Sequence, residues 1–177
     1  MAATSSSLIL LLQLLSLTTA CLFQQTNGDP VDQVCGQTKD PPLCSESLRL
    51  ADPDGSQSTS LLDLAQLTIN TAQDKAIDTK IKIHTILVQA QDPTLRLLYS
   101  NCDDLYYDAL DAFRAMPGEL KGQQYAALNQ LGLRVRGSVN GCEAALDNNY
   151  PLKNENQVVG ILADAIAVVA NSLLRLN

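Results

Sequence analysis

Few side chains in this 177-residue sequence could take part in acid–base or metal chemistry. His84 is the only histidine, so no second imidazole is present to share a metal ion or relay a proton. Asp103 and Asp104 form an acidic pair, but neighbouring side chains on a helix point about 100° apart and do not converge on one substrate atom. We therefore interpret His84 as a structural or surface residue and the aspartates as part of a solvated face.

Sequence motifs of catalysis are also missing. The sequence contains no glycine-rich phosphate loop, nucleophile elbow or metalloprotease motif. Tyr99, Tyr106 and Tyr107 could line a ligand cavity, but Tyr106 falls on an apolar helical stripe and is expected in the core. The other two are expected at the boundary of the core, with their hydroxyl groups in water. We predict that the protein is not an enzyme and requires no metal ion or cofactor.

The cysteines indicate an oxidising compartment. Residues 1–28 carry no charged side chain, and Leu8–Leu17 is a leucine-rich run of the length of a signal-peptide core, shorter than a membrane span. We predict that residues 1–28 are a secretion signal. Cleavage after Gly28 removes Cys21, whereas cleavage after Ala20 would leave Cys21 as an unpaired thiol. The first choice leaves four cysteines, an even number, as is usual in secreted chains.

These four cysteines allow three pairings. Asp40-Pro41-Pro42 is a turn that folds two short apolar arms together, and Cys35 and Cys44 lie on the two arms. Gly122 lies midway between Cys102 and Cys142, in the connection between two predicted helices. Antiparallel helices would therefore bring these two cysteines to similar heights. We predict bridges between Cys35 and Cys44 and between Cys102 and Cys142.

Apolar residues recur at helical spacing in four long segments. The predicted helices span about 59–90, 92–116, 123–146 and 154–176, and Met116-Pro117-Gly118 is expected to end the second one. Short connections favour an all-α, up-down-up-down four-helix bundle. After the signal, residues 29–177 are predicted to form one domain, with the hairpin and a loop at 29–58 and the bundle at 59–177.

The net charge restricts the partners. At −7, the chain is unsuited to nucleic acid or to an anionic membrane, and a basic protein partner would fit it better. The last predicted helix is apolar on more than one face, but Asp164 and Arg175 argue against a membrane span or a lipid-anchor tail. We expect no membrane association after signal cleavage.

The cysteine spacing and one segment resemble the plant invertase and pectin methylesterase inhibitor family. The resemblance covers nearly the whole mature chain and is most marked in the group that contains the plane-tree pollen allergen. It implies an N-terminal helical hairpin, a four-helix bundle, the same two disulfides, and stoichiometric inhibition of pectin methylesterase or acid invertase in the cell wall (the apoplast), with the vacuole less favoured. The matching segments are Val34-Cys35, Leu43-Cys44, Leu98–Ala109 (LYSNCDDLYYDA), the region of Tyr125, Gly141-Cys142-Glu143 and the apolar last helix.

The resemblance also indicates which target to favour. Family members that inhibit invertase carry a Pro-Lys-Phe triad at the start of the third bundle helix, where this sequence has Gln123, Gln124 and Tyr125. Only the aromatic character is kept, so pectin methylesterase is the favoured target and acid invertase the alternative. Inhibitors of this kind cover the mouth of a cleft with a few anchor residues inside a polar rim. The candidate contacts are Tyr107, Asp108 and Asp111 together with residues 123–125.

A different class of function stays open. The same fold could serve as a carrier of a hydrophobic ligand, or as a pollen protein without inhibitory activity. A carrier requires an apolar cavity between the helices, whereas a bundle packed to ordinary density has none.

Overall fold

The computed structural model describes residues 28–146 and 151–176. In this part of the chain every regular element is a helix, which confirms the all-α prediction. The predicted signal peptide falls outside the described residues except for Gly28, and it stays a prediction. The helices are α2 (Pro30–Cys35), α3 (Pro41–Ala51), α4 (Leu61–Gln89), α5 (Pro93–Lys121), α6 (Tyr125–Leu146) and α7 (Lys153–Leu176).

Short polar side chains begin the first four helices. Asp92 accepts a hydrogen bond from the backbone N–H of Thr94 at 2.7 Å, and Pro93 occupies the first helical position, where no backbone donor is needed. Ser60 caps α4 in the same way through the N–H of Asp63. Asp29 and Asp40 cap α2 and α3. These capping residues determine where the four helices begin.

Helix α5 is longer than predicted. The sequence Met116-Pro117-Gly118 was expected to end it, but the helix continues to Lys121, and Gly122 N–H bonds to the carbonyl of Gly118 at 2.9 Å. A proline removes only one backbone N–H donor from the hydrogen bonds of a helix. Pro117 is also exposed, so its ring lies in solvent. Met116 and Leu120 are buried on either side of it. Their packing holds the last turn in helical form.

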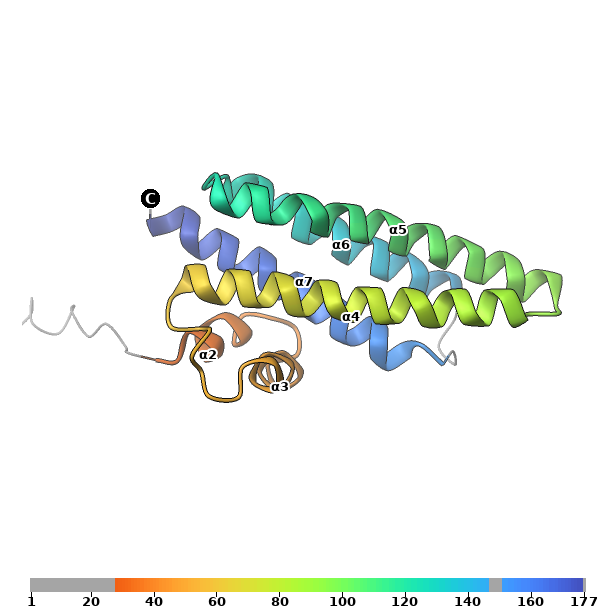
Figure 1. Ribbon diagram of the computed structural model, residues 1–177, viewed down its shortest axis with the longest axis horizontal. Helices are drawn as coiled ribbons and strands as arrows, with labels where there is room; N and C mark the ends of the chain where they lie inside the picture. The colour runs from red at the N-terminus through yellow and green to blue at the C-terminus, as the bar shows by residue number, and fades with distance from the viewer. Residues whose placement is uncertain (1–27, 147–150, 177) are drawn as a thin grey trace, which may run out of the picture.

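The four long helices form the predicted up-down-up-down bundle (Figure 1). Helix α4 packs against α5 and α7, and α6 packs against the same two helices, so consecutive helices are neighbours and α7 closes the ring. The interior is filled by large apolar side chains that are fully buried. They include Leu64, Ile69 and Ile83 of α4, Tyr106 and Phe113 of α5, Leu128 of α6, and Leu162 and Ile166 of α7.

The N-terminal hairpin covers one side of the bundle. The Cys35–Cys44 bridge joins α2 to α3, and Arg49 of α3 forms ion pairs with Asp29 at 2.9 Å and Asp32 at 2.7 Å. Both helices lie against α4 and α7 (Figure 1). Helix α7 therefore contacts protein on several sides, which explains why it is apolar on more than one face. It is the one described helix long and apolar enough to cross a membrane, and 61% of its most apolar stretch is buried within the protein.

The second bridge, Cys102–Cys142, joins α5 to α6 with 4.7 Å between the Cα atoms, so both predicted pairings are confirmed. A buried polar chain extends from it to α7. Tyr106 donates its hydroxyl hydrogen to Asn156 Oδ1 at 2.6 Å, and Asn156 Nδ2 approaches Cys142 Sγ at 3.6 Å. A buried amide without partners would be costly, so this contact fixes α7 in register with α5 and α6.

Helices α6 and α7 approach closely at Gly132. A Cβ atom at this position would lie 3.1 Å from the carbonyl oxygen of Ala163 and 3.2 Å from the backbone nitrogen of Ala167. The two obstructing atoms belong to a helix backbone and cannot move like a flexible side chain. Gly137, one and a half turns further along α6, is exposed and would place a Cβ in open space.

Replacing these two glycines by the same residue should therefore have opposite consequences. Gly132→Val should lower the free energy of unfolding by about 2 to 3 kcal/mol, because α7 must move away. Gly137→Val should change it by less than about 0.5 kcal/mol, since valine is only slightly better than glycine as a helix former. Chemical denaturation measures both values. Equal stabilities for the two variants would contradict the close approach of α6 and α7.

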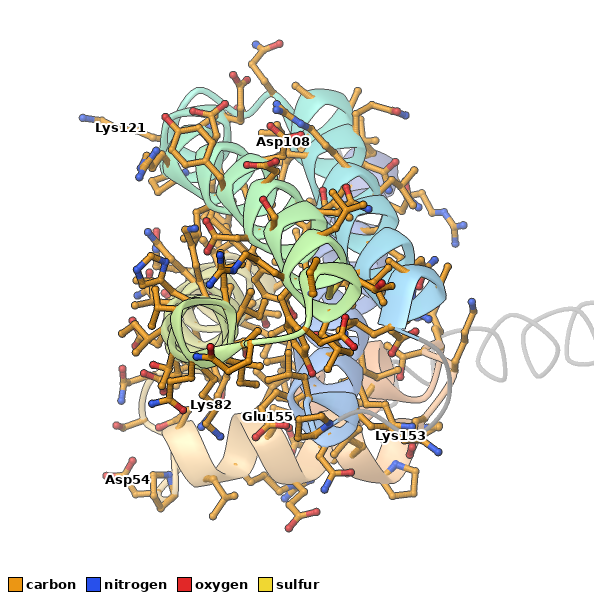
Figure 2. The ribbon with its side chains drawn as sticks, turned by 90° about the vertical axis from the view of Figure 1, so that its right-hand side faces the viewer. Asp54, Lys82, Asp108, Lys121, Lys153 and Glu155 are labelled. Carbon is orange, nitrogen blue, oxygen red and sulfur yellow. A yellow bond between two sulfur atoms is a disulfide. The ribbon has the colours of Figure 1, made fainter. Side chains whose placement is uncertain are left out.

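Ion pairs connect α4 to its two neighbours. Lys80 pairs with Asp103 of α5 at 2.7 Å, and Lys82 donates a hydrogen bond to Glu155 at the start of α7 (Figure 2). The hydrogen bond from Lys82 holds the pKa of Glu155 below its ordinary value of 4.5. A carboxylate whose pKa is lower in the folded state stabilises the fold above its ordinary pKa and loses this effect as the pH falls through the folded value.

Glu155→Gln should accordingly lower the melting temperature at pH 7 by about 1 to 3 °C, the size expected for a partly exposed ion pair in a domain of this length. The difference from the unchanged protein should shrink below about pH 4.5, the ordinary value for this group, and vanish in stronger acid. Glu143→Gln is the control, because Glu143 of α6 makes no ion pair in the described residues. A difference that is constant with pH would exclude the ion pair as its cause.

Candidate binding surface

Charged side chains of α5 and α6 meet on an exposed face of the bundle. Arg134 of α6 places Nη2 3.8 Å from Asp108 Oδ1 and 3.7 Å from Asp111 Oδ2, both on α5. The side chains remain 48%, 59% and 56% exposed, respectively. In Figure 2, Asp108 lies in the upper part of the view, between α5 and α6 and away from the hairpin. One arginine thus holds two carboxylates that are still open to solvent.

Two more residues of α5 join this arrangement. Arg114 lies 4.0 Å from Asp111 Oδ1, and its guanidinium carbon is 5.9 Å from the centre of the Tyr107 ring, within the range of a cation–π contact. Tyr107 is 58% exposed, although it is a large aromatic side chain. We refer to Tyr107, Asp108, Asp111, Arg114 and Arg134 as the α5–α6 cluster.

The α5–α6 cluster has the properties of a recognition surface. Exposed ion pairs with separations near 4 Å add little to stability, so these residues are not needed to hold the helices together. Tyrosine and arginine are enriched at protein interfaces and among the residues that dominate binding energy. The cluster presents one aromatic ring, two carboxylates and two guanidinium groups to solvent. Each arginine contacts at least one of the aspartates, and Arg114 also contacts the ring of Tyr107.

Three of these five residues, Tyr107, Asp108 and Asp111, are candidate contacts from the sequence. The structure brings them together, and their role in binding stays a prediction. Arg114 was missed, although its position three residues after Asp111 places it on the same face. Arg134 was also missed because it belongs to a different helix, and only the relative height of α5 and α6 shows that it faces the two aspartates.

Gln123 and Gln124 lie apart from the cluster, in the turn between α5 and α6. Both are exposed, and Gln123 adopts a left-handed backbone conformation with φ of 56°. The turn is closed by bonds from Gln123 N–H to Leu120 O at 3.1 Å and from Gln124 N–H to Glu119 O at 2.8 Å. At 1.5 Å rise per residue, the turn lies roughly 18 Å along α5 from Asp111. It could contact a partner only at the edge of a large interface.

The structure places Tyr125 in the core rather than on the predicted contact surface. It is the first residue of α6 and only 4% exposed. The physical reason is its helical spacing to Leu128 and Val135, which are fully buried on the same face of α6. Its ring anchors the start of α6 and so fixes the position of the preceding glutamines.

The other residues considered for chemistry have structural surroundings. His84 is exposed on α4. Asp103 is paired with Lys80 and its side chain is only 22% exposed, so it is not part of a fully solvated face, whereas Asp104 is exposed. Tyr99 is 5% exposed, contrary to the boundary position expected, and burial raises its pKa. Among the described residues, no three His, Cys, Asp or Glu side chains are grouped to hold a metal ion.

A carrier of a hydrophobic ligand would need an apolar cavity. A groove of about 520 Å³ lies between the hairpin and the bundle, next to α3, α4 and the start of α7. It opens to solvent and has charged side chains around it, so it is not the enclosed apolar cavity that a carrier would need. The charged residues are Glu46, Asp74, Lys75, Asp78, Lys82 and Glu155.

Solved structures of known inhibitors share this fold. A mutant form of a pectin methylesterase inhibitor from Arabidopsis superimposes with a TM-score of 0.71 over 81% of this chain and 97% of that one. A second pectin methylesterase inhibitor from Arabidopsis thaliana gives a TM-score of 0.62 over 84% and 98%. Both are 20% identical to this chain, a level at which the likeness concerns the fold alone.

Sequence comparison identifies relatives with named activities. A pectinesterase inhibitor of Actinidia deliciosa is 30% identical, over 96% of this chain and 95% of its own length. Pectinesterase inhibitor 1 of Arabidopsis thaliana is 24% identical, over 80% and 81% of the two chains. The names confirm the expectation of an enzyme inhibitor rather than an enzyme. Residues 29–173 match the family described as plant invertase/pectin methylesterase inhibitor, and the chain belongs to that family.

Proposed function

We propose that this protein inhibits a pectin methylesterase and binds it through the α5–α6 cluster. The observation that carries the proposal is the 30% identity, over nearly the full length of both chains, to a protein named pectinesterase inhibitor. The second relative bears the same type of name. The α5–α6 cluster supports the location, because it combines exposure with residue types that are common at interfaces.

The proposed mechanism is occlusion of the active-site cleft. A stable complex of ordinary size covers about 800 Å² on each partner, and the long, straight face of α5 and α6 offers such an area. Tyr107 and Arg114 would serve as anchors, since both reach solvent while each holds the other in position. Asp108 and Asp111 would exchange part of their pairing with Arg134 for basic groups of the enzyme. The net charge of −7 suits a basic partner and would accelerate encounter at low salt.

The place of action follows from the cysteines and the N-terminal segment. We propose that residues 1–28 are removed as a secretion signal and that residues 29–177 form the inhibitor domain in the cell wall. Two disulfides support an oxidising compartment, where such bridges persist. The apoplast is favoured over the vacuole because pectin methylesterase acts on the wall.

Acid invertase is the alternative target, since the family includes inhibitors of both enzymes. The triad expected of an invertase inhibitor is represented by Gln123, Gln124 and Tyr125, so its lysine is absent. Tyr125 is also buried and cannot enter the active site of an invertase without leaving the core. These two observations favour pectin methylesterase.

Titration of the disulfide-intact protein, residues 29–177, into separate assays of the two enzymes tests the proposal. We expect plant pectin methylesterase activity to fall to near zero at about one inhibitor per enzyme, with acid invertase unaffected. Activity should be measured at several inhibitor concentrations and protein integrity checked by circular dichroism. Loss of invertase activity alone would replace the favoured target by the alternative, and inhibition of neither enzyme would refute the proposal.

Charge reversal locates the binding surface. Asp108→Lys should weaken inhibition of pectin methylesterase at least tenfold, which corresponds to about 1.4 kcal/mol, because it places a third cation beside Arg114 and Arg134. Asp54→Lys is the matched control: it changes the net charge equally but lies on the loop at the opposite side of the molecule (Figure 2). Inhibition constants and melting temperatures should be measured for both. Equal effects of the two substitutions would show that only net charge matters and would remove the α5–α6 cluster from the interface.

A further inference from the structure

The groove between the hairpin and the bundle lies on the other side of the molecule from the α5–α6 cluster. Helix α3 contacts α4 and α7 but neither α5 nor α6 in the described residues. In Figure 2, Asp108 lies in the upper part of the view, whereas Lys82 and Glu155 of the groove lie in the lower part, above α3. Figure 1 likewise shows α3 on the side of the bundle that is opposite to α5. A partner in the groove would therefore leave the proposed enzyme-binding surface free.

The floor of the groove is apolar. Leu43 and Ala51 of α3 and Val158 of α7 are partly buried there, at the junction of the hairpin and the bundle. Leu50 of α3 lies at the rim of the groove, and it is 74% exposed although it is a large aliphatic residue. An aliphatic side chain of a partner could lie on this floor and cover Leu50 at the same time.

The edge of the groove is acidic. Asp74 and Asp78 lie four residues apart on α4, and both are exposed. Like charges at this spacing repel each other and destabilise a helix. Lys82, one turn beyond Asp78, is held by Glu155 of α7 instead of neutralising the aspartate. Neither aspartate has an ion-pair partner in the described residues, nor has Glu46 across the groove.

We propose that this groove binds an amphipathic, basic peptide segment of a second protein. Its aliphatic side chain would lie on Leu43 and Val158, and its cationic side chains would pair with Asp74 and Asp78 at the edge. Four carboxylates and two ammonium groups line the groove, which gives it a net negative charge. This negative charge would repel an anionic membrane surface. A small hydrophilic cation could pair with the carboxylates but would leave the apolar floor of the groove in contact with water. An extended or helical segment with both features satisfies the edge and the floor together.

A designed peptide can test the groove directly. The capped heptapeptide KLLKLLK should bind to isotope-labelled, disulfide-intact protein of residues 29–177, with chemical-shift changes confined to α3, the middle of α4 and the start of α7. The double substitution Asp74→Asn and Asp78→Asn should raise the dissociation constant at least fivefold. The matched control, Asp108→Asn with Asp111→Asn, removes two carboxylates from α5 and should leave peptide binding unchanged.

Two control peptides and an inhibition assay separate the alternatives. ELLELLE and KSSKSSK should each bind at least fivefold more weakly than KLLKLLK, because one lacks the charge and the other the apolar side chains. The Asp74→Asn, Asp78→Asn protein should retain full inhibition of pectin methylesterase if that enzyme is the target. Peptide binding and enzyme inhibition are therefore measured separately, and the failure of one proposal does not imply the failure of the other. Unchanged binding after loss of both aspartates, equal binding of KSSKSSK, shifts spread over α5 and α6, or no binding at millimolar peptide would each overturn the proposal.

Discussion

The bridge between Cys102 and Cys142 sets the relative height of α5 and α6, and the candidate binding surface depends on that height. The two helices are antiparallel, so residues at equal distances from the bridge face each other. Arg134 then comes to the level of Leu110, between Asp108 and Asp111, where the structure places it. A shift of one helical turn, about 5.4 Å, would separate the guanidinium group from both carboxylates. The same bridge lies beside Asn156, through which α7 is fixed to the pair.

Helix α7 unites the two halves of the molecule. It contacts α4 and α6 in the bundle and α2 and α3 in the hairpin, which accounts for its apolar composition without a membrane. Close packing against α6 requires the missing side chain at Gly132, and Asn129 adds a hydrogen bond to the carbonyl of Ala167 at 3.0 Å. Because buried contacts hold α7 in position, α7 provides a rigid surface against which the hairpin packs. The groove at this junction is a consequence of that docking.

The core and the surface of this protein serve different ends. Apolar burial, two disulfides and the Tyr106–Asn156 hydrogen bond supply the stability of the bundle. The surface ion pairs of the α5–α6 cluster contribute little to stability. Asp74 and Asp78 of α4, which have no ion-pair partner among the described residues, are unfavourable to the helix. Such groups can be exchanged for contacts with a partner at small cost to the fold. A rigid scaffold with exchangeable surface charges suits a protein that acts by binding.

The sequence by itself determined the helical class, the number of long helices, the disulfide pairing and most of the helix starts. These features depend on local spacing, caps and turns, or on one distance along the chain, as with Gly122 midway between Cys102 and Cys142. Tertiary structure decided the continuation of α5 past Pro117, the burial of Tyr99, and the partners of Asp103 and Asp108. Each of these depends on which faces of different helices meet and on side chains from distant segments. Periodicity tells which face of a helix is apolar, but not which residue of another helix lies opposite it.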